Sequence, residues 1–427
     1  MTPPAMPTGR ERGQGGSPLG YSDWISRDGK LVFLEKATRT IPYGFLSVAF
    51  SLYLQYLGFS LVQIGIVLTL TILSSALYTF VISFVADRIG RRRTLMFFAL
   101  TDFIAGALLF SSTAWWAPVF AGIVGNMTVG AGEVGPFLSL EQAILPRTCD
   151  SSRRTFAFSV YNFVGYGASA LGAGLAGLAS TPSPDQLRPF FLGYLASGLL
   201  GAFLYSRLSK RVESDAAATK RAVLTPKARP IVYRLSALFA IDSFGGGFIG
   251  GNILSLYFAD RFGLQLGSLG LLFLLTQLVT AGSFLLATPI AKRIGLLRTM
   301  VFSHVPSNVF LIGVAFAPTA LGAVVLLLCR QSLSQMDVPT RQSYVMAIVD
   351  EADRTPAAGF TSTTRTVTSS ISPSIAGYAL ENLWLGTPLV AAGALKLLYD
   401  ALIYVSFRKV HPPEEKVREA PGKPPPG

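Results

Sequence analysis

Apolar runs of about twenty residues follow one another from residue 38 to residue 408, separated by short polar connections. A helix of about twenty apolar residues crosses roughly 30 Å of hydrocarbon, and a backbone in lipid must satisfy its own hydrogen bonds. The pattern therefore predicts an all-α membrane protein with twelve transmembrane helices. We expect these spans at residues 38–58, 62–86, 94–114, 117–145, 155–180, 188–208, 232–258, 267–291, 299–317, 319–348, 357–380 and 386–408.

The longest polar connection lies between the sixth and seventh predicted spans, at residues 209–231, and it is rich in Lys and Arg. We interpret it as a cytoplasmic linker between two six-helix bundles, residues 38–208 and 232–408. Residues 1–37 are rich in Pro, Gly and Ser and are interpreted as a cytoplasmic tail. Residues 409–427 have the composition of a disordered cytoplasmic tail.

Composition agrees with this picture, since 51% of the residues are hydrophobic and only 14% are charged. The net charge of +13 could suggest a nucleic-acid partner, but the basic residues lie in the connections after the even-numbered spans. The opposite connections carry almost no charge. By the positive-inside rule, both termini are expected in the cytoplasm, in a multi-pass protein of the cell membrane. The lipid bilayer is therefore the expected partner, and nucleic acid is not.

Enzyme chemistry has little support in the sequence. The only two cysteines and the only two histidines have no metal-ligand spacing, and no phosphate-binding loop is present. We therefore expect no catalytic residues, no metal and no cofactor, and no direct use of a nucleotide.

Short motifs recur about 205 residues apart. Ser51-Leu52-Tyr53 returns as Ser255-Leu256-Tyr257, and the basic stretch ADRIGRRRTL at 86–95 returns as AKRIGLLRTM at 291–300. The repeat also contains three matched pairs, which are Gly58 with Gly263, Gly65 with Gly270 and Pro136 with Pro339. Two similar halves of the same orientation are typical of a large class of secondary transporters.

The chain resembles the major facilitator superfamily over roughly residues 38–408, and is nearest to its drug and solute efflux branch. The resemblance is carried by the loop after the second predicted span, with Asp87, Arg88, Gly90, Arg91 and Arg92. Ser83 stands where the family has a glycine. Two antiporter motifs are incomplete: Asn126 replaces an arginine, and the glycine-rich fifth span lacks the usual proline.

The resemblance implies that this loop is a gate. Asp87 would lie against the amino end of the eleventh helix, near Thr355 and Pro356, where free amides and the helix dipole favour a carboxylate. Arg91 would form an ion pair with Glu141 at the end of the fourth span. The alternative is that these arginines only set the orientation in the membrane. The predicted gating residues are Asp87, Arg88, Gly90, Arg91, Arg92 and Glu141.

Ionisable residues inside predicted spans indicate function because each is costly to insert, by roughly 2.5 to 3.5 kcal/mol. Counted along their helices, Asp242, Asp337 and Arg365 share one layer of the membrane. Arg341 follows Asp337 on the same helix face, and Arg39 has the pseudo-symmetric depth of Asp242. We therefore predict one buried cluster of these five residues.

Glu133 is expected to face this cluster from the other half. The predicted set of cavity charges is Glu133, Asp242, Asp337, Arg39, Arg341 and Arg365. Either at least one of the acids Glu133, Asp242 and Asp337 carries the coupling proton, or the charges are fixed ion pairs between helices.

Polar side chains in the same region have two interpretations. Tyr43, Asn126, Asn162 and Asn252 could contact a substrate, or could be packed between helices. Lys396 and Asp400 lie four residues apart and are interpreted as a local structural pair. The glycine-rich run at 242–252 suggests a hinge in the seventh helix.

The sequence thus predicts a monomeric secondary transporter that moves a small organic solute by alternating access, with protons as the coupling ion and export as the direction. The alternatives are a proton-coupled uptake symporter, a uniporter of a metabolite, or a transporter-like membrane sensor.

Overall fold

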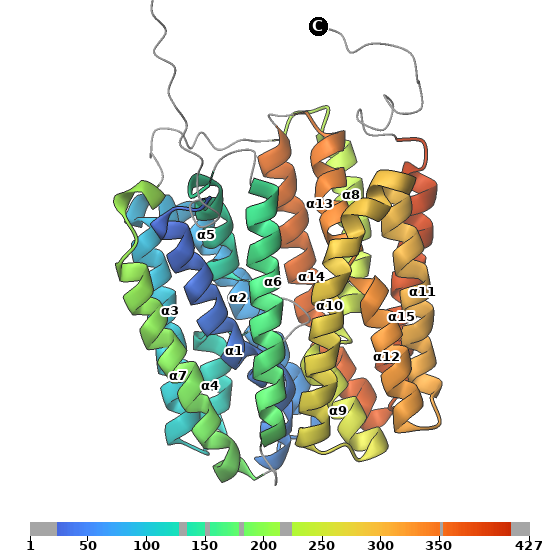
Figure 1. The fold of residues 1–427 in the computed structure, drawn as a ribbon. Coiled ribbons are helices and arrows are strands. Elements are labelled where there is room, and N and C mark those ends of the chain that lie inside the picture. Colours follow the sequence, from blue (N-terminus) through green and yellow to red (C-terminus); the bar gives the residue numbers. More distant parts are fainter. Residues whose placement is uncertain are drawn as a thin grey trace, which may run out of the picture.

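The computed structural model describes residues 24–127, 135–149, 154–178, 183–213, 224–350 and 353–410, and helices make up the bundle formed by these residues (Figure 1). The first half contains α1 (Arg27–Tyr56), α2 (Leu61–Ile89), α3 (Arg91–Ser111), α4 (Trp116–Val124), α5 (Pro136–Ile144), α6 (Arg154–Leu175) and α7 (Pro184–Ser206). The second half contains α8 (Arg229–Gly247), α9 (Gly251–Phe262), α10 (Leu266–Ile294), α11 (Leu296–Phe316), α12 (Ala320–Ser334), α13 (Asp337–Ile348), α14 (Arg354–Asn382) and α15 (Thr387–Phe407).

Seven stretches of the described residues are long and apolar enough, by length and composition, to cross a membrane. They correspond to α2, α3, α7, α8 with α9, α10, α11 and α15. The other predicted spans correspond to α1, α4 with α5, α6, α12 with α13, and α14, which are interrupted or more polar. The architecture is that of twelve transmembrane helices in two pseudo-symmetric six-helix bundles.

Three predicted spans are each divided into two helices. The seventh breaks between Gly247 and Gly251, inside the glycine-rich run, where low helix propensity makes an interruption inexpensive. The tenth breaks between Ser334 and Asp337. The fourth is described as α4 and α5 only, because residues 128–134 lie outside the described part of the chain.

The first helix begins at Arg27 rather than near residue 38. Its amino end is capped by Ser26, whose side chain accepts a hydrogen bond from the backbone of Gly29. Glu35, Lys36 and Arg39 in this early part are all buried. We predicted the start of this helix about ten residues too far along the chain, because charged residues in a sequence are expected to be exposed to solvent. In the structure neighbouring helices cover these charged side chains.

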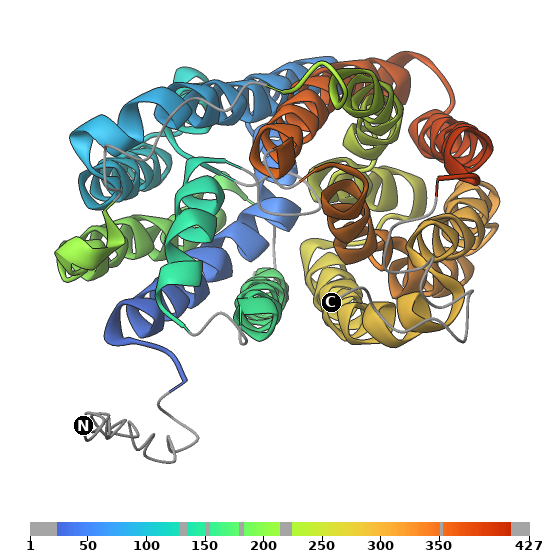
Figure 2. The same cartoon turned by 90° about the horizontal axis from the view of Figure 1, so that it is seen from above.

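The two halves lie side by side, with α1–α7 in blue to green and α8–α15 in yellow-green to red (Figure 2). Across the interface α2 packs against α14, α6 packs against α10, and α1 packs against α9. We call the end where α7 finishes and α8 begins the linker end, which is uppermost in Figure 1, and the opposite end the far end.

The repeated glycines have the same role in both halves. Gly65 of α2 faces α14, where an added Cβ atom would lie 3.2 Å from the Cα atom of Gly377. Its repeat partner Gly270 of α10 faces the end of α6, where a Cβ atom would lie 2.8 Å from the backbone oxygen of Ala173. Small residues therefore allow the two long helix crossings between the halves to approach closely.

We expect Gly65→Leu to lower the free energy of unfolding by about 1 to 3 kcal/mol, because the larger side chain forces α2 away from α14. Unfolding of the purified protein in mixed micelles of dodecyl maltoside and SDS measures this. Gly282→Leu in α10 is the control, since a Cβ atom there meets nothing within 4 Å. Equal effects of both substitutions would contradict the role of Gly65.

Candidate functional site

A buried charge network joins four helices of the first half. Arg39 of α1 donates from Nε to Glu35, over 2.9 Å, and from a terminal nitrogen to Glu141 of α5, over 2.7 Å. The hydroxyls of Tyr161 on α6 and Tyr205 on α7 donate to the same Glu141 carboxylate, over 2.5 and 2.7 Å. Arg39 is 1% exposed and Glu141 is 0% exposed. Glu141 therefore ties α1, α5, α6 and α7 together.

These partners of Glu141 differ from the one we predicted. Arg91, the expected partner, donates from its side chain to the backbone oxygen of Ala143, over 3.3 Å. The backbone amides of Arg91 and Arg92 donate to the carboxylate of Glu213, over 2.5 and 3.3 Å. The amino end of α3 has no other side-chain cap, because its N-cap residue is Gly90. A carboxylate is favoured there by the free amides, and Glu213 supplies it.

The remainder of the predicted gate is only partly visible. Arg88 is exposed, and Arg92 donates from its side chain to the backbone oxygen of Leu208, over 3.2 Å. The side chains of Asp87, Thr355 and Pro356 lie outside the described part of the chain, so the proposed contact between them stays a prediction.

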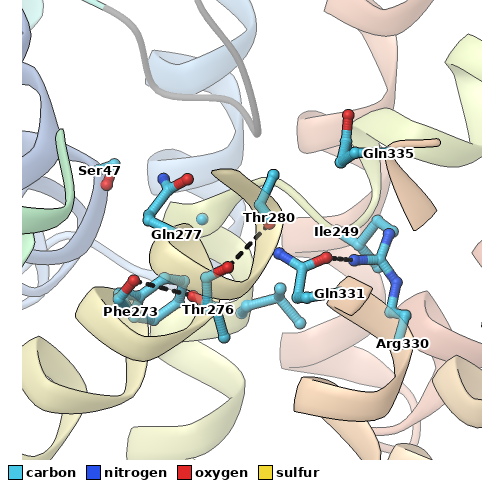
Figure 3. A pocket seen from close by; sticks show the side chains of 11 residues that line it. Ser47, Ile249, Phe273, Thr276, Gln277, Thr280, Arg330, Gln331 and Gln335 are labelled. Carbon is cyan, nitrogen blue, oxygen red and sulfur yellow. Dashed lines mark hydrogen bonds between the residues drawn. The ribbon is translucent and has the colours of Figure 1, made fainter. Parts of the chain in front are cut away.

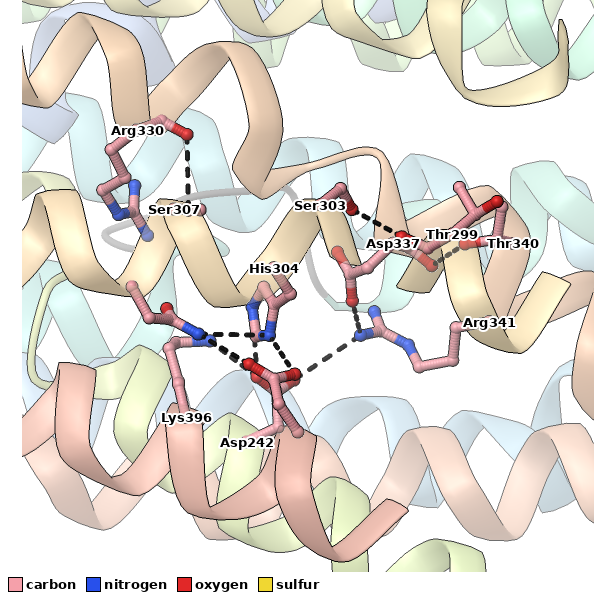
Figure 4. Close-up of polar contacts among 12 residues, drawn as sticks. Asp242, Thr299, Ser303, His304, Ser307, Arg330, Asp337, Thr340, Arg341 and Lys396 are labelled. Carbon is pink, nitrogen blue, oxygen red and sulfur yellow. Dashed lines mark hydrogen bonds and ion pairs between the residues drawn. The ribbon is translucent and has the colours of Figure 1, made fainter. Parts of the chain in front are cut away.

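A second charge network surrounds Asp242 of α8 (Figure 4). Lys396 of α15 lies 2.6 Å from its carboxylate, Arg365 of α14 lies 2.8 Å away, and Arg341 of α13 lies 3.5 Å away. The Nε2 atom of His304 on α11 lies 3.8 Å away. Side chains from four helices thus meet one buried carboxylate on a fifth.

The predicted cluster of five residues is divided between the two networks. Asp242, Asp337, Arg341 and Arg365 lie together in the second half, where Asp337 forms an ion pair with Arg341. Arg39 belongs to the first half instead. The pseudo-symmetric depth of Arg39 was read from the repeat, but depth alone does not decide which half supplies a partner. Glu133 lies outside the described residues.

The predicted local pair of Lys396 and Asp400 is replaced by longer-range contacts. Lys396 donates to Asp242, while Asp400 lies 2.8 Å from Nδ1 of His304 and accepts from Asn308 over 3.0 Å. Spacing along one helix indicates only which partners are possible on that helix. The actual partners lie on neighbouring helices, and the spacing of residues along α15 gives no information about them.

Asp102 is a buried acid that we did not single out from the sequence. It lies in the middle of α3 and accepts hydrogen bonds from the hydroxyls of Tyr43 and Tyr194, each over 2.9 Å, and from the backbone of Asn126, over 2.8 Å. The signal was present as a lone carboxylate inside an apolar span. Two predicted substrate-cavity residues, Tyr43 and Asn126, are therefore engaged in contacts within the first half.

Asn252 and Asn162, the other predicted cavity residues, have different surroundings. Asn252 is fully buried and accepts a hydrogen bond from the backbone of Ser51, over 3.0 Å. Asn162 is half-buried on α6.

The repeated serines connect the two halves at the far end. Ser51 of α1 also donates its hydroxyl to the backbone oxygen of Asn252 in α9, over 3.0 Å, and Ser255 of α9 donates to Val48 of α1, over 2.8 Å. Gln55 and Asp260 form a further contact of 3.3 Å on the same pair of helices. The Ser-Leu-Tyr repeat thus places reciprocal hydrogen bonds where the halves meet.

A pocket lies beside the helix breaks of the seventh and tenth predicted spans (Figure 3). The enclosed part of this pocket is small, with about 20 Å³ of room for a water-sized molecule, and the wider empty volume of about 420 Å³ includes space that is open to solvent. Its lining comes from both halves and from two of the helix breaks. The residues are Ser47, Ile249, Gly251, Leu254, Phe273, Thr276, Gln277, Thr280, Arg330, Gln331 and Gln335. Among the described residues, no group of three or more His, Cys, Asp and Glu side chains could hold a metal ion.

Known proteins share this sequence pattern and this fold. A sequence model of the Major Facilitator Superfamily matches residues 37–336. An uncharacterized membrane protein of Saccharomyces cerevisiae is 25% identical over 423 residues, covering 90% of this chain and 94% of its own length.

Two crystal structures show the same architecture. That of the nucleoside transporter NupG has a TM-score of 0.68 at 14% identity and covers 90% of this chain and 99% of its own. That of a D-xylose-proton symporter has a TM-score of 0.69 at 13% identity and covers 88% of this chain and 97% of its own. The chain is thus a multi-pass membrane transporter of small solutes rather than an enzyme, and it belongs to the major facilitator superfamily.

Proposed function

We propose that this transporter moves a small organic solute by alternating access and that protons drive the movement. The observation that carries the proposal is the convergence of cations from three helices, with His304 from a fourth, on the buried carboxylate of Asp242. Charged groups in a membrane interior are expensive and are retained where they act on function or hold helices in place.

In this arrangement Arg341, Arg365 and Lys396 stabilise the ionised carboxylate of Asp242, so a proton would bind there as these side chains move away. The bound proton would then weaken the attraction of Asp242 to all three. These side chains lie on α13, α14 and α15, and α14 also packs along α2 of the other half. Protonation would therefore loosen α8 from the helix that forms much of the interface between the halves. Protonation of the Asp242 carboxylate would therefore shift the equilibrium between the two arrangements of the halves that alternating access requires.

The hydrogen bonds of Ser51 and Ser255 keep the far end closed in the proposed transport cycle. They hold α1 and α9 together in this structure and must break when the transporter opens at that end. The motif loop at the linker end, with Asp87 as its predicted carboxylate, would form the opposing gate. The same fold serves a D-xylose-proton symporter, which supports proton coupling on this architecture.

The proposal also includes the orientation in the membrane, the oligomeric state and the direction of transport. We propose that the protein lies in the plasma or inner membrane of the cell, with residues 209–231 and both termini in the cytoplasm, and that it acts as a monomer. The direction is export, which rests on the general resemblance to the family, since the two antiporter motifs are incomplete.

The test is solute flux into proteoliposomes that contain the purified full chain. We expect a panel of solutes to include one whose flux follows the sign of an imposed pH gradient and falls to the level of empty liposomes when a protonophore removes the gradient. Solute flux that is independent of the pH gradient would indicate a uniporter. The sign of the coupling distinguishes export from uptake.

A further inference from the structure

We infer that the pocket between the halves binds an anionic group of the transported solute, a carboxylate or phosphate, through Arg330. The inference concerns the substrate class and rests on the transport function proposed above. It begins from a guanidinium that differs from the buried cations of the two charge networks.

Arg330 of α12 is 5% exposed and lines the pocket (Figure 3). One terminal nitrogen donates to the side-chain amide of Gln331, and its Nε atom has no hydrogen-bond partner among the described residues. By contrast, Arg39, Arg341 and Lys396 each form an ion pair with a buried carboxylate. A buried charge without a counter-charge is costly unless a ligand supplies one.

The charges of the second half lead to the same conclusion. The network holds three carboxylates, Asp242, Asp337 and Asp400, and besides Arg330 it holds the three fixed cations Arg341, Arg365 and Lys396. These three carboxylates and three cations are equal in number. Among the described residues Arg330 has no carboxylate at ion-pair distance, and an anion bound beside it would supply one.

The helix break at the pocket adds a second positive feature. Gly251, the first residue of α9, lines the pocket, and the preceding N-cap residue Gly250 provides no side chain to cap the helix. The amino end of a helix of this length carries partial positive charge and free amides. The lining contains no Asp or Glu, and Gln277 and Gln335 can donate further hydrogen bonds. The pocket is thus built for a negative group.

Binding to the purified full chain in detergent tests this inference without requiring transport. The probes are matched pairs: benzoate and benzamide, succinate and succinamide, and glycerol phosphate and glycerol. We expect at least one anion to raise the thermal unfolding midpoint in a saturable way while its neutral partner does not. Stabilisation by the neutral members alone, or by no anion, would overturn the inference.

Variants then place the anion at Arg330. Arg330→Gln is expected to raise the apparent Kd of that anion at least about tenfold, or about 1.4 kcal/mol. Gln335→Glu should also raise it, because it adds a negative charge to the wall while leaving Arg330 intact. Arg330→Lys, which keeps the charge, should lose less affinity. Arg298→Gln, on an exposed arginine after α10, is the matched control and should bind as the wild type does.

The outcomes separate the two proposals. An unchanged Kd in both Arg330→Gln and Gln335→Glu would overturn the assignment of the site. Gradient-driven flux of a neutral solute, with no preference for its anionic partner, would overturn the substrate class but leave proton-coupled transport standing. Anion binding that depends on Arg330 without any gradient-driven flux would support the site and contradict the proposed function.

Discussion

Asp242→Asn is expected to abolish flux driven by a pH gradient while solute exchange without a gradient continues. The asparagine side chain cannot take up and release a proton, and it no longer attracts the three cations around it. Proteoliposomes loaded with solute measure both properties, since counterflow needs only the alternation of the binding site and gradient-driven flux also needs the proton.

This substitution also leaves buried cations without their carboxylate, which destabilises a protein by about 3 to 5 kcal/mol. The amount of folded protein must therefore be matched before rates are compared, and Asp242→Glu should retain gradient-driven flux. Asp185→Asn is the control, because the Asp185 side chain is 82% exposed and pairs with Arg188 of its own helix. If Asp242→Asn and Glu133→Gln both keep normal proton dependence, the charges are fixed ion pairs and the proposed coupling is wrong.

Arg39→Met is expected to lower the free energy of unfolding by about 3 to 5 kcal/mol. The guanidinium pairs with Glu35 and Glu141, and removing it deprives two buried carboxylates of a direct charge partner. Unfolding in mixed micelles with increasing SDS gives the difference from the wild type, and Arg293→Gln on an exposed arginine serves as the control.

A second substitution distinguishes a charge effect from lost packing. In the Arg39→Met background, Glu141→Gln should restore part of the stability, because it removes one of the unpaired carboxylates while keeping acceptors for Tyr161 and Tyr205. A loss below about 1 kcal/mol in the single variant, or no recovery in the double variant, would show that the network around Glu141 contributes little to stability.

The helices and their pairing into two halves could be predicted from local pattern. Apolar length predicts a span, and the repeat of Gly65 at Gly270 indicates equivalent positions in two bundles. The structure shows why these glycines recur, since both lie at close helix crossings between the halves. The boundary of the first helix was missed because the charges before residue 38 are covered by other helices.

The ion-pair partners could not be predicted in the same way. Asp242, Arg341 and Arg365 were recognised from their depth in apolar spans, but Lys396 was assigned to Asp400 on its own helix, and Asp102 was overlooked. The reciprocal bonds of Ser51 and Ser255 were visible only as a repeated tripeptide.

The sequence by itself determined the membrane setting, the helical spans, the duplicated architecture and the family, because these depend on hydropathy and on short motifs that can be compared along the chain. The tertiary structure decided which charges meet, which helices the glycines bring together, and which buried guanidinium has no ion pair among the described residues. The physical reason is that a side chain in a helix bundle takes its partners from several neighbouring helices, and their packing angles and rotations are properties of the whole fold.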